Sequence, residues 1–204
     1  MDALIEGYRR FRAGAWPKHK ELYDSLAAHG QSPRALVIAC SDSRVDPQLI
    51  FDAGPGELFV VRNVASLVPP YMPDSEYHGT SAAIEFAVRA LEVERIVVMG
   101  HAQCGGVNAL LNGTPAHLGD FIENWMRMAT RARERVVAAT EDPVERQRLG
   151  EFETVKVSLE NLMTFPWIRE RVEAGKLTLH GSYFGVAKGK LWVLGPDGAF
   201  APVD

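Results

Sequence analysis

The only two cysteines of the chain lie in two short polar motifs, CSDSR at residues 40–44 and HAQCGG at residues 101–106. Cys40 opens the first motif, and His101 and Cys104 belong to the second. Two thiolates and one imidazole form a ligand set that zinc accepts, and three protein ligands leave the fourth tetrahedral position to water. No further Cys or His stands at a spacing that would close the site. The residues therefore predict an open, reactive zinc centre.

Other roles for these residues also fit their types. A disulfide between Cys40 and Cys104 is disfavoured because residues 1–15 show no basic-then-apolar signal segment, and intracellular thiols stay reduced. A buried cysteine at a strand end is common, but that role leaves His101 and the second cysteine unexplained. A Cys–His nucleophilic pair stays open, although a second cysteine beside the histidine favours metal ligation.

Asp42 and Arg44 share the first motif with Cys40. Asp42 is close enough to the first ligand to reach the fourth metal position and to accept a hydrogen bond from a zinc-bound hydroxide. The same carboxylate could displace the water, and the planar guanidinium of Arg44 can restrain it by binding both oxygens. An ordinary surface ion pair, worth about 0–1 kcal/mol, is the alternative. Gly105 would let a backbone amide approach the Cys104 sulfur, although a turn into a helix explains this glycine nearly as well.

Short apolar runs precede both motifs and predict the elements that position them. Residues 34–39, 58–62 and 95–100 are typical of buried strands. Residues 177–183 and 190–194 predict a closing hairpin. The segments with helical character are 47–52, 80–91, 105–111, 118–139, 143–165 and 166–174.

This alternation indicates an α/β fold, with a mostly parallel central sheet of about five strands, an antiparallel edge strand and flanking helices. In open sheets of this kind, ligands bind beyond the carboxyl ends of the strands where the strand order reverses. If the strands 34–39 and 95–100 are neighbours at that point, both motifs meet there.

The first thirty residues are expected to form a helical arm. Apolar side chains recur there at helical spacing, namely Leu4, Ile5, Tyr8 and Phe11, and Pro17 is typical of the first position of a second helix reaching residue 28. We expect a single domain over 1–204, with the arm at 1–30 and the core, C-terminal helices and hairpin at 31–204. The apolar arm also contains Trp16, and it needs a surface to cover, which predicts self-association.

Composition excludes several classes of protein. Of 204 residues, 47% are hydrophobic and 24% charged, which is usual for a globular domain. No run approaches the ~18 apolar residues of a membrane span, so no membrane partner is expected. A net charge of −4 argues against a nucleic-acid partner, because phosphates require a basic face. We expect a cytoplasmic protein.

The motifs, together with RNVA at 62–65 and AAIEFAV at 82–88, resemble those of the β-class carbonic anhydrases. The resemblance covers residues 31–112 in motif detail and nearly the whole chain in organisation. It implies hydration of carbon dioxide to bicarbonate and a proton through a hydroxide on one zinc ion per chain. It implies that the metal ligands are Cys40, His101 and Cys104, with Asp42 and Arg44 as an adjacent catalytic dyad. It also implies a dimer or tetramer with the active sites at the subunit boundary and the arm packed on the neighbour.

Within that family, the chain is more similar to the plant-like branch. Gln31 stands where that branch has a glutamine near the substrate, and Phe59 where it has an apolar wall residue. Val37 occupies the place of the tryptophan of the bicarbonate-regulated branch. Phe86 stands where plant-like members usually have tyrosine, so a hydroxyl is lost. By this resemblance Gln31, Phe59, Phe86 and Gly105 are the expected substrate-binding residues.

Two further functions use the same residues. The same zinc hydroxide could attack carbonyl sulfide or carbon disulfide, with pocket access deciding the substrate. Alternatively, the chain could be a zinc- or bicarbonate-binding module in which Asp42 fills the fourth position permanently. The presence of Arg44 argues against the second function, because loss of that arginine is the expected mark of a locked site.

Overall fold

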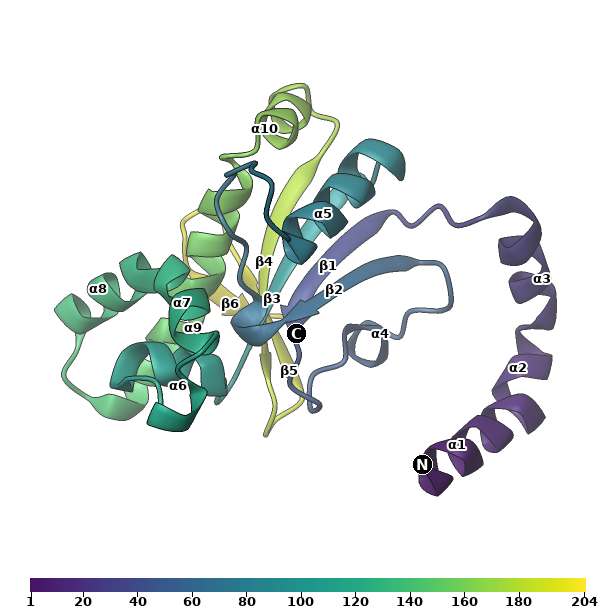
Figure 1. Ribbon diagram of the computed structural model, residues 1–204, viewed down its shortest axis with the longest axis horizontal. Coiled ribbons are helices and arrows are strands. Elements are labelled where there is room, and N and C mark those ends of the chain that lie inside the picture. The colour runs from purple at the N-terminus through teal and green to yellow at the C-terminus, as the bar shows by residue number, and fades with distance from the viewer.

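A single mixed sheet forms the centre of the protein in the computed structural model, which describes residues 1–204 (Figure 1). The six strands follow the order β2-β1-β3-β4-β5-β6. Strands β2, β1, β3 and β4 are parallel, whereas β5 and β6 are antiparallel to their neighbours. The strand bounds are β1 Ala35–Cys40, β2 Leu58–Asn63, β3 Arg95–His101, β4 Thr178–Gly185, β5 Lys190–Leu194 and β6 Phe200–Pro202.

The predicted α/β fold with a mostly parallel sheet is confirmed. The one additional strand, β6, comprises three residues after a turn at residues 195–199. A segment of this length carries no readable alternation of apolar and polar residues, which is why its sequence pattern does not predict it.

Helices pack mainly on one face of the sheet. The bounds are α4 Pro47–Ile50, α5 Gly79–Glu85, α6 Gly105–Asn112, α7 Ile122–Met126, α8 Thr130–Ala139, α9 Pro143–Leu162 and α10 Pro166–Glu173. The larger core cluster joins alternate residues of β1 and β3, such as Leu36 and Ile96, to α5, α9 and α10. The opposite face carries a smaller cluster around Val37, Ala39 and Met99 beside α4. None of the helices combines the length and apolar composition that crossing a membrane requires.

Two expected helices are broken in the structure. The segment predicted as one helix over 118–139 divides into α7 and α8, joined by the 3₁₀ turn Arg127–Ala129. In place of the single helix expected over 80–91, the structure has α5, which ends at Glu85, followed directly by the π-helical turn Phe86–Ala90. Apolar periodicity locates both segments correctly, but it does not distinguish an α-helix from the tighter or wider turns that share nearly the same period.

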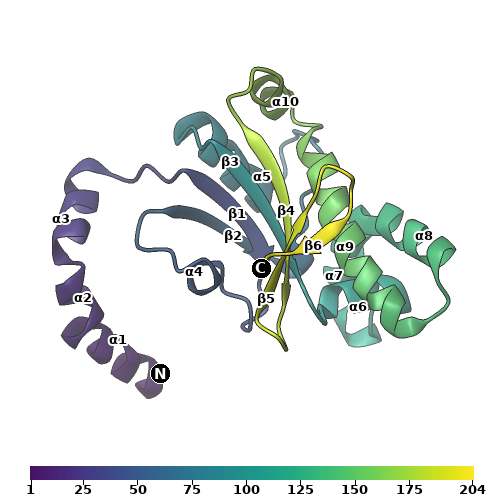
Figure 2. The same cartoon turned by 180° about the vertical axis from the view of Figure 1, so that it is seen from behind.

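The N-terminal arm consists of α1 Asp2–Ala13, α2 Ala15–Lys18 and α3 Lys20–His29. Figures 1 and 2 show that it extends away from the sheet, on the side opposite the group formed by α6 to α9. None of its helical residues is buried within the chain. The expectation that Pro17 opens the second long helix is wrong: Pro17 lies within the short α2, and the next helix begins at Lys20.

The strand order reverses between β1 and β3. The chain passes from β1 to its neighbour β2 on one side and later continues with β3 and β4 on the other side. The loops that leave the carboxyl ends of β1 and β3 therefore diverge and leave a crevice between them. The two polar motifs occupy these two loops, so the expectation that they meet at the switch point is confirmed.

Candidate metal centre

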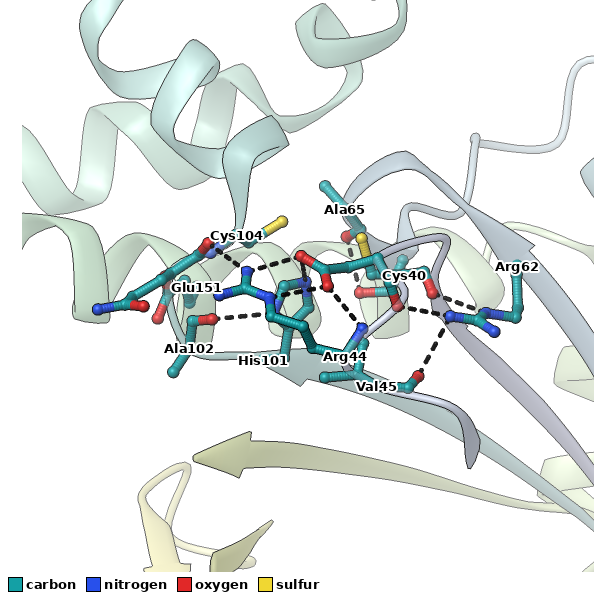
Figure 3. Close-up of polar contacts among 12 residues, drawn as sticks. Cys40, Arg44, Val45, Arg62, Ala65, His101, Ala102, Cys104 and Glu151 are labelled. Atoms are coloured by element: carbon teal, nitrogen blue, oxygen red, sulfur yellow. Dashed lines mark hydrogen bonds and ion pairs between the residues drawn. The ribbon is translucent and has the colours of Figure 1, made fainter. Parts of the chain in front are cut away.

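Cys40, His101 and Cys104 converge at the carboxyl ends of β1 and β3 (Figure 3). Their ligand atoms all lie within 4.8 Å of one another. All three side chains are buried, with exposed fractions of 6%, 1% and 3%. Ligands placed about 2.0–2.3 Å from one zinc ion stand roughly 3.5–4 Å apart in a tetrahedral site. A small contraction of this cluster therefore suffices to hold the ion.

The imidazole of His101 is oriented for metal ligation. Its Nδ1 lies 2.9 Å from the carbonyl oxygen of Ala102, and because a carbonyl only accepts, Nδ1 carries the proton. Nε2 then presents a lone pair, and this buried atom has no hydrogen-bond partner. A buried nitrogen without a hydrogen-bond partner destabilises the folded state, because it loses its hydration, unless it binds a ligand such as a metal ion. The orphaned Nε2, facing two sulfur atoms, fits a zinc ion.

The two thiols influence each other strongly. Hydrogen bonding with Cys104 lowers the pKa of the Cys40 thiol to about 4, and the nearby His101 ring acts in the same direction, although burial opposes both. The same contact and burial raise the pKa of Cys104 far above its usual value, although the backbone amides of Val107 and Gly106 counteract it. Burial lowers the pKa of His101, but the proximity of Cys40 outweighs burial and raises it overall. These shifts favour a thiolate on Cys40, and a cation bound by both sulfurs would require Cys104 to release its proton as well.

Asp42 and Arg44 form a bidentate ion pair beside the cluster. Nε and Nη2 of Arg44 donate to Oδ1 and Oδ2 of Asp42 at 2.9 and 2.7 Å, and the Arg44 amide adds a bond of 2.9 Å. These bonds hold the pKa of the Asp42 carboxyl well below its usual range. Oδ2 also lies 4.0 Å from Nε2 of His101. The carboxylate thus stands next to the cluster while Arg44 occupies both of its oxygens, as the restraining role requires.

Glu151 supports the loop of Cys104 from helix α9. The residue is 3% exposed, and its carboxylate accepts three hydrogen bonds, from the Cys104 amide at 3.1 Å, the Gln147 amide group at 2.8 Å and the Tyr183 hydroxyl at 2.9 Å. Gln147 also donates to the carbonyl oxygen of Cys104. Glu151 therefore fixes the backbone that carries Cys104, although the sequence offers no signal that distinguishes it from the other glutamates of its helix.

A turn after β2 lies against the other cysteine. Ala65 and Ser66 adopt left-handed backbone conformations, with φ of +64° and +51°. The Asn63 side chain bonds both the amide and the carbonyl of Leu67, and Trp125 donates to the Val64 carbonyl at 2.7 Å. The Ala65 amide thereby reaches the sulfur of Cys40. Strain of this kind persists where surrounding contacts enforce it.

The expected substrate-binding residues lie in two places. Gly105 is the first residue of α6 and follows Cys104 directly, but a β-carbon there would meet nothing within 4 Å, so packing does not require glycine. Phe59 and Phe86 stack on each other with ring centroids 6.0 Å apart. Phe59 is in register with Leu36, four residues before Cys40, so the structure does not bring this pair to the cluster of its own chain.

Gln31 is also distant from the cluster of its own chain. It is exposed and precedes β1, whereas Cys40 ends that strand. At about 3.3 Å per residue, the strand alone separates them by roughly 17 Å. The substrate contacts expected of Gln31, Phe59 and Phe86 therefore stay predictions, and they require a second copy of the chain.

A mixed sheet flanked by helices, with two cysteines and one histidine at its switch point beside a restrained aspartate, is the arrangement expected of a metal-dependent enzyme. The family model described as carbonic anhydrase matches residues 35–191. Beta carbonic anhydrase 3 of Arabidopsis thaliana is 38% identical over 95% of this chain and 77% of its own length. A carbonic anhydrase of Synechocystis is 40% identical over 97% of this chain and 72% of its own length. The chain belongs to the β-carbonic anhydrase family of enzymes.

Solved structures agree with this assignment. The β-carbonic anhydrase CcaA superposes with a TM-score of 0.93 at 35% identity, covering 100% of this chain and 92% of that one. A structure described as one of two tetrameric β-carbonic anhydrases of Sordaria macrospora gives a TM-score of 0.81 at 30% identity, covering 100% and 98%. The CcaA comparison spans the whole chain, so it includes the arm as well as the sheet.

Proposed function

We propose that the chain catalyses the reversible hydration of carbon dioxide to bicarbonate and a proton, with one zinc ion held by Cys40, His101 and Cys104. The observation that carries this proposal is the buried S₂N cluster in which Nε2 of His101 has no hydrogen-bond partner. The donor set suits zinc, and its three ligands leave one position for a reactant. Membership of the β-carbonic anhydrase family supports the choice of substrate.

The bound ion would supply a hydroxide nucleophile at neutral pH, by lowering the pKa of a coordinated water from 15.7 towards about 7. Asp42 supplies orientation. Because Arg44 holds its pKa well below the usual range, the Asp42 carboxylate is ionised at neutral pH and can only accept a hydrogen bond, which would direct a lone pair of the attacking oxygen towards the carbon. Arg44 keeps this carboxylate at a fixed distance from the cluster. Holding the attacking oxygen and the Asp42 carboxylate in a fixed geometry lowers the entropic part of the activation barrier, because the two groups need not find each other by diffusion.

Stopped-flow measurement of carbon dioxide hydration tests the proposal. Protein loaded with zinc is expected to accelerate hydration in proportion to its metal content, and the metal-free form prepared with a chelator is the control. Restoring zinc to the chelated protein should restore the rate. Protein with one zinc per chain that leaves the uncatalysed rate unchanged between pH 7 and 9 would contradict the proposed function.

We also infer that the active form is an assembly of identical chains. The arm exposes Leu4, Tyr8 and Leu22 at 73%, 60% and 40%, which is an unusual amount of apolar surface for helices that cover nothing in their own chain. The tetrameric description of the Sordaria protein supports self-association. A second copy would cover the arm and could bring Gln31, Phe59 and Phe86 towards a cluster other than their own.

Removal of residues 1–28 is therefore expected to yield aggregates or inactive monomers. The deletion takes away the apolar helices and exposes whatever surface they cover in the assembly. Light scattering coupled to size-exclusion chromatography measures the mass, and the hydration assay measures activity on the same fractions. A monomeric truncated protein with the full activity per zinc would refute both the arm's role and the shared site.

A further inference from the structure

Arg62 on strand β2 binds the loop that carries Asp42 and Arg44 (Figure 3). Its Nε donates to the carbonyl oxygen of Cys40 at 2.9 Å. Its Nη2 donates to the carbonyl oxygen of Asp42 at 2.6 Å and lies 3.4 Å from that of Val45. One side chain from a neighbouring strand therefore satisfies three carbonyls of a single loop.

The third nitrogen of Arg62 connects the loop to the following helix. Nη1 lies 3.3 Å from Oδ2 of Asp46. The other oxygen of Asp46 accepts the amide of Gln48 at 2.9 Å and so caps the first turn of α4. Arg62 thus holds both ends of the segment from Cys40 to Asp46. A lysine could not do this, because a single ammonium group lacks the planar fork that spans several acceptors.

Asp42 is consequently fixed at two points by two different arginines. Arg44 binds its carboxylate, and Arg62 binds its backbone carbonyl. Few other contacts anchor this loop to β2; the Ser41 amide donates to the Asn63 carbonyl at 2.8 Å. Without Arg62, the carbonyls of Cys40 and Asp42 would have to find other partners, and the backbone bearing the dyad would shift.

We propose that Arg62 is a positioning residue for the reaction, which sets the distance between the Asp42 carboxylate and the metal cluster by fixing the loop's backbone. This inference rests on the proposed hydration activity. The relevant distance is short, since Oδ2 of Asp42 lies 4.0 Å from Nε2 of His101. A displacement of about 1 Å at a reacting centre can lower a rate about 100-fold. The side-chain contacts of Arg62 are with the carbonyls of the loop and with Asp46, so Arg62 acts through the loop.

Arg62→Gln tests this role against a matched control. Arg146→Gln makes the same chemical change at another partly buried arginine, whose side-chain hydrogen bonds go only to the carbonyl of Thr140, from Nε and Nη2 at 3.2 and 2.9 Å. We expect Arg62→Gln to lower kcat per bound zinc at least 10-fold with zinc retained, and Arg146→Gln to lower it less than 2-fold. Arg62→Lys, which keeps the charge but not the fork, should fall between wild type and Arg62→Gln.

Cobalt substitution supplies a readout independent of turnover. The visible absorption of Co(II) bound to thiolates and imidazole depends on its geometry and on what occupies the fourth position. We expect this spectrum to change in Arg62→Gln and to stay unchanged in Arg146→Gln. Equal activity per metal and identical spectra for wild type and Arg62→Gln would overturn the proposal, as would equal losses in both glutamine variants.

The two proposals fail in distinguishable ways. A zinc-loaded wild type that does not hydrate carbon dioxide would refute the proposed function. An altered Co(II) spectrum in Arg62→Gln would still support the positioning role of Arg62. Should Arg62→Gln not fold, Arg62→Lys decides the matter by the same two measurements. A folded Arg62→Lys with wild-type spectrum and wild-type kcat would refute the positioning role.

Discussion

Replacing Cys40 with serine is expected to abolish zinc binding and carbon dioxide hydration together. A neutral serine hydroxyl is a poor zinc ligand compared with a thiolate, and Cys40 is the thiol whose pKa the site lowers to about 4. Losing one of three protein ligands leaves only His101 and Cys104, which cannot retain the ion against a chelator. Metal content per chain and stopped-flow hydration, measured on the same sample, check this result.

The control for this variant is Ser41→Ala, the adjacent residue of the same loop. It should keep one zinc per chain and most of the activity. A circular dichroism melt of both variants in metal-free form separates loss of a ligand from loss of the fold. Full zinc occupancy in Cys40→Ser would show that the ligand set has been assigned wrongly.

The second large effect is expected for Arg44→Ala. Without the guanidinium, the Asp42 carboxylate is free to move from its present place beside His101 onto the metal, where it would exclude the reactant. Zinc should stay bound, while activity falls by about 100-fold or more, the size of effect seen when one preorganised group of an active site is lost. Zinc analysis and kcat/KM together distinguish this outcome from a loss of metal.

A double variant makes the mechanism of this loss testable. If Arg44→Ala acts by releasing Asp42, then adding Asp42→Ala removes the competing carboxylate and should recover part of the activity. Asp42→Ala alone should keep zinc and lower the rate, because the position stays open but the orienting acceptor is gone. A double variant less active than Arg44→Ala would mean that the arginine contributes by some route other than restraining Asp42.

The convergence of Cys40, His101 and Cys104 and the ion pair of Asp42 with Arg44 could be predicted, because the two motifs are local and the topology is regular. Cys40 and His101 each end a short apolar strand, and parallel neighbouring strands deliver their carboxyl ends to one edge. The types of residue at those ends then limit the chemistry to a small number of choices. The same reasoning predicts the α/β class, because alternating strands and helices leave few arrangements.

The supporting contacts could not be predicted from their sequence positions. Glu151 is one of several glutamates on α9, and its partner Cys104 is 47 residues away in the chain. Arg62 belongs to a strand whose sequence pattern gives no indication of which carbonyls it will bind. Such groups are selected by long-range packing rather than by local pattern. The sequence likewise does not show which surface covers the exposed apolar face of the N-terminal arm, because that surface does not belong to the arm's own surroundings in one chain.

The close approach of α9 to β3 has a consequence for the order of folding. A β-carbon on Gly100 would stand 2.7 Å from Cγ2 of Val155, so the helix lies directly against the strand that ends in His101. The same helix bonds the Cys104 amide through Glu151. Long-range contacts of this kind form slowly, because the entropy of closing the intervening chain is lost before the contacts stabilise the fold. In small zinc fingers, metal binding drives folding. In this protein we expect the α/β core to fold first and the zinc ion to bind last. Zinc uptake would then measure the fraction of chains that have folded completely.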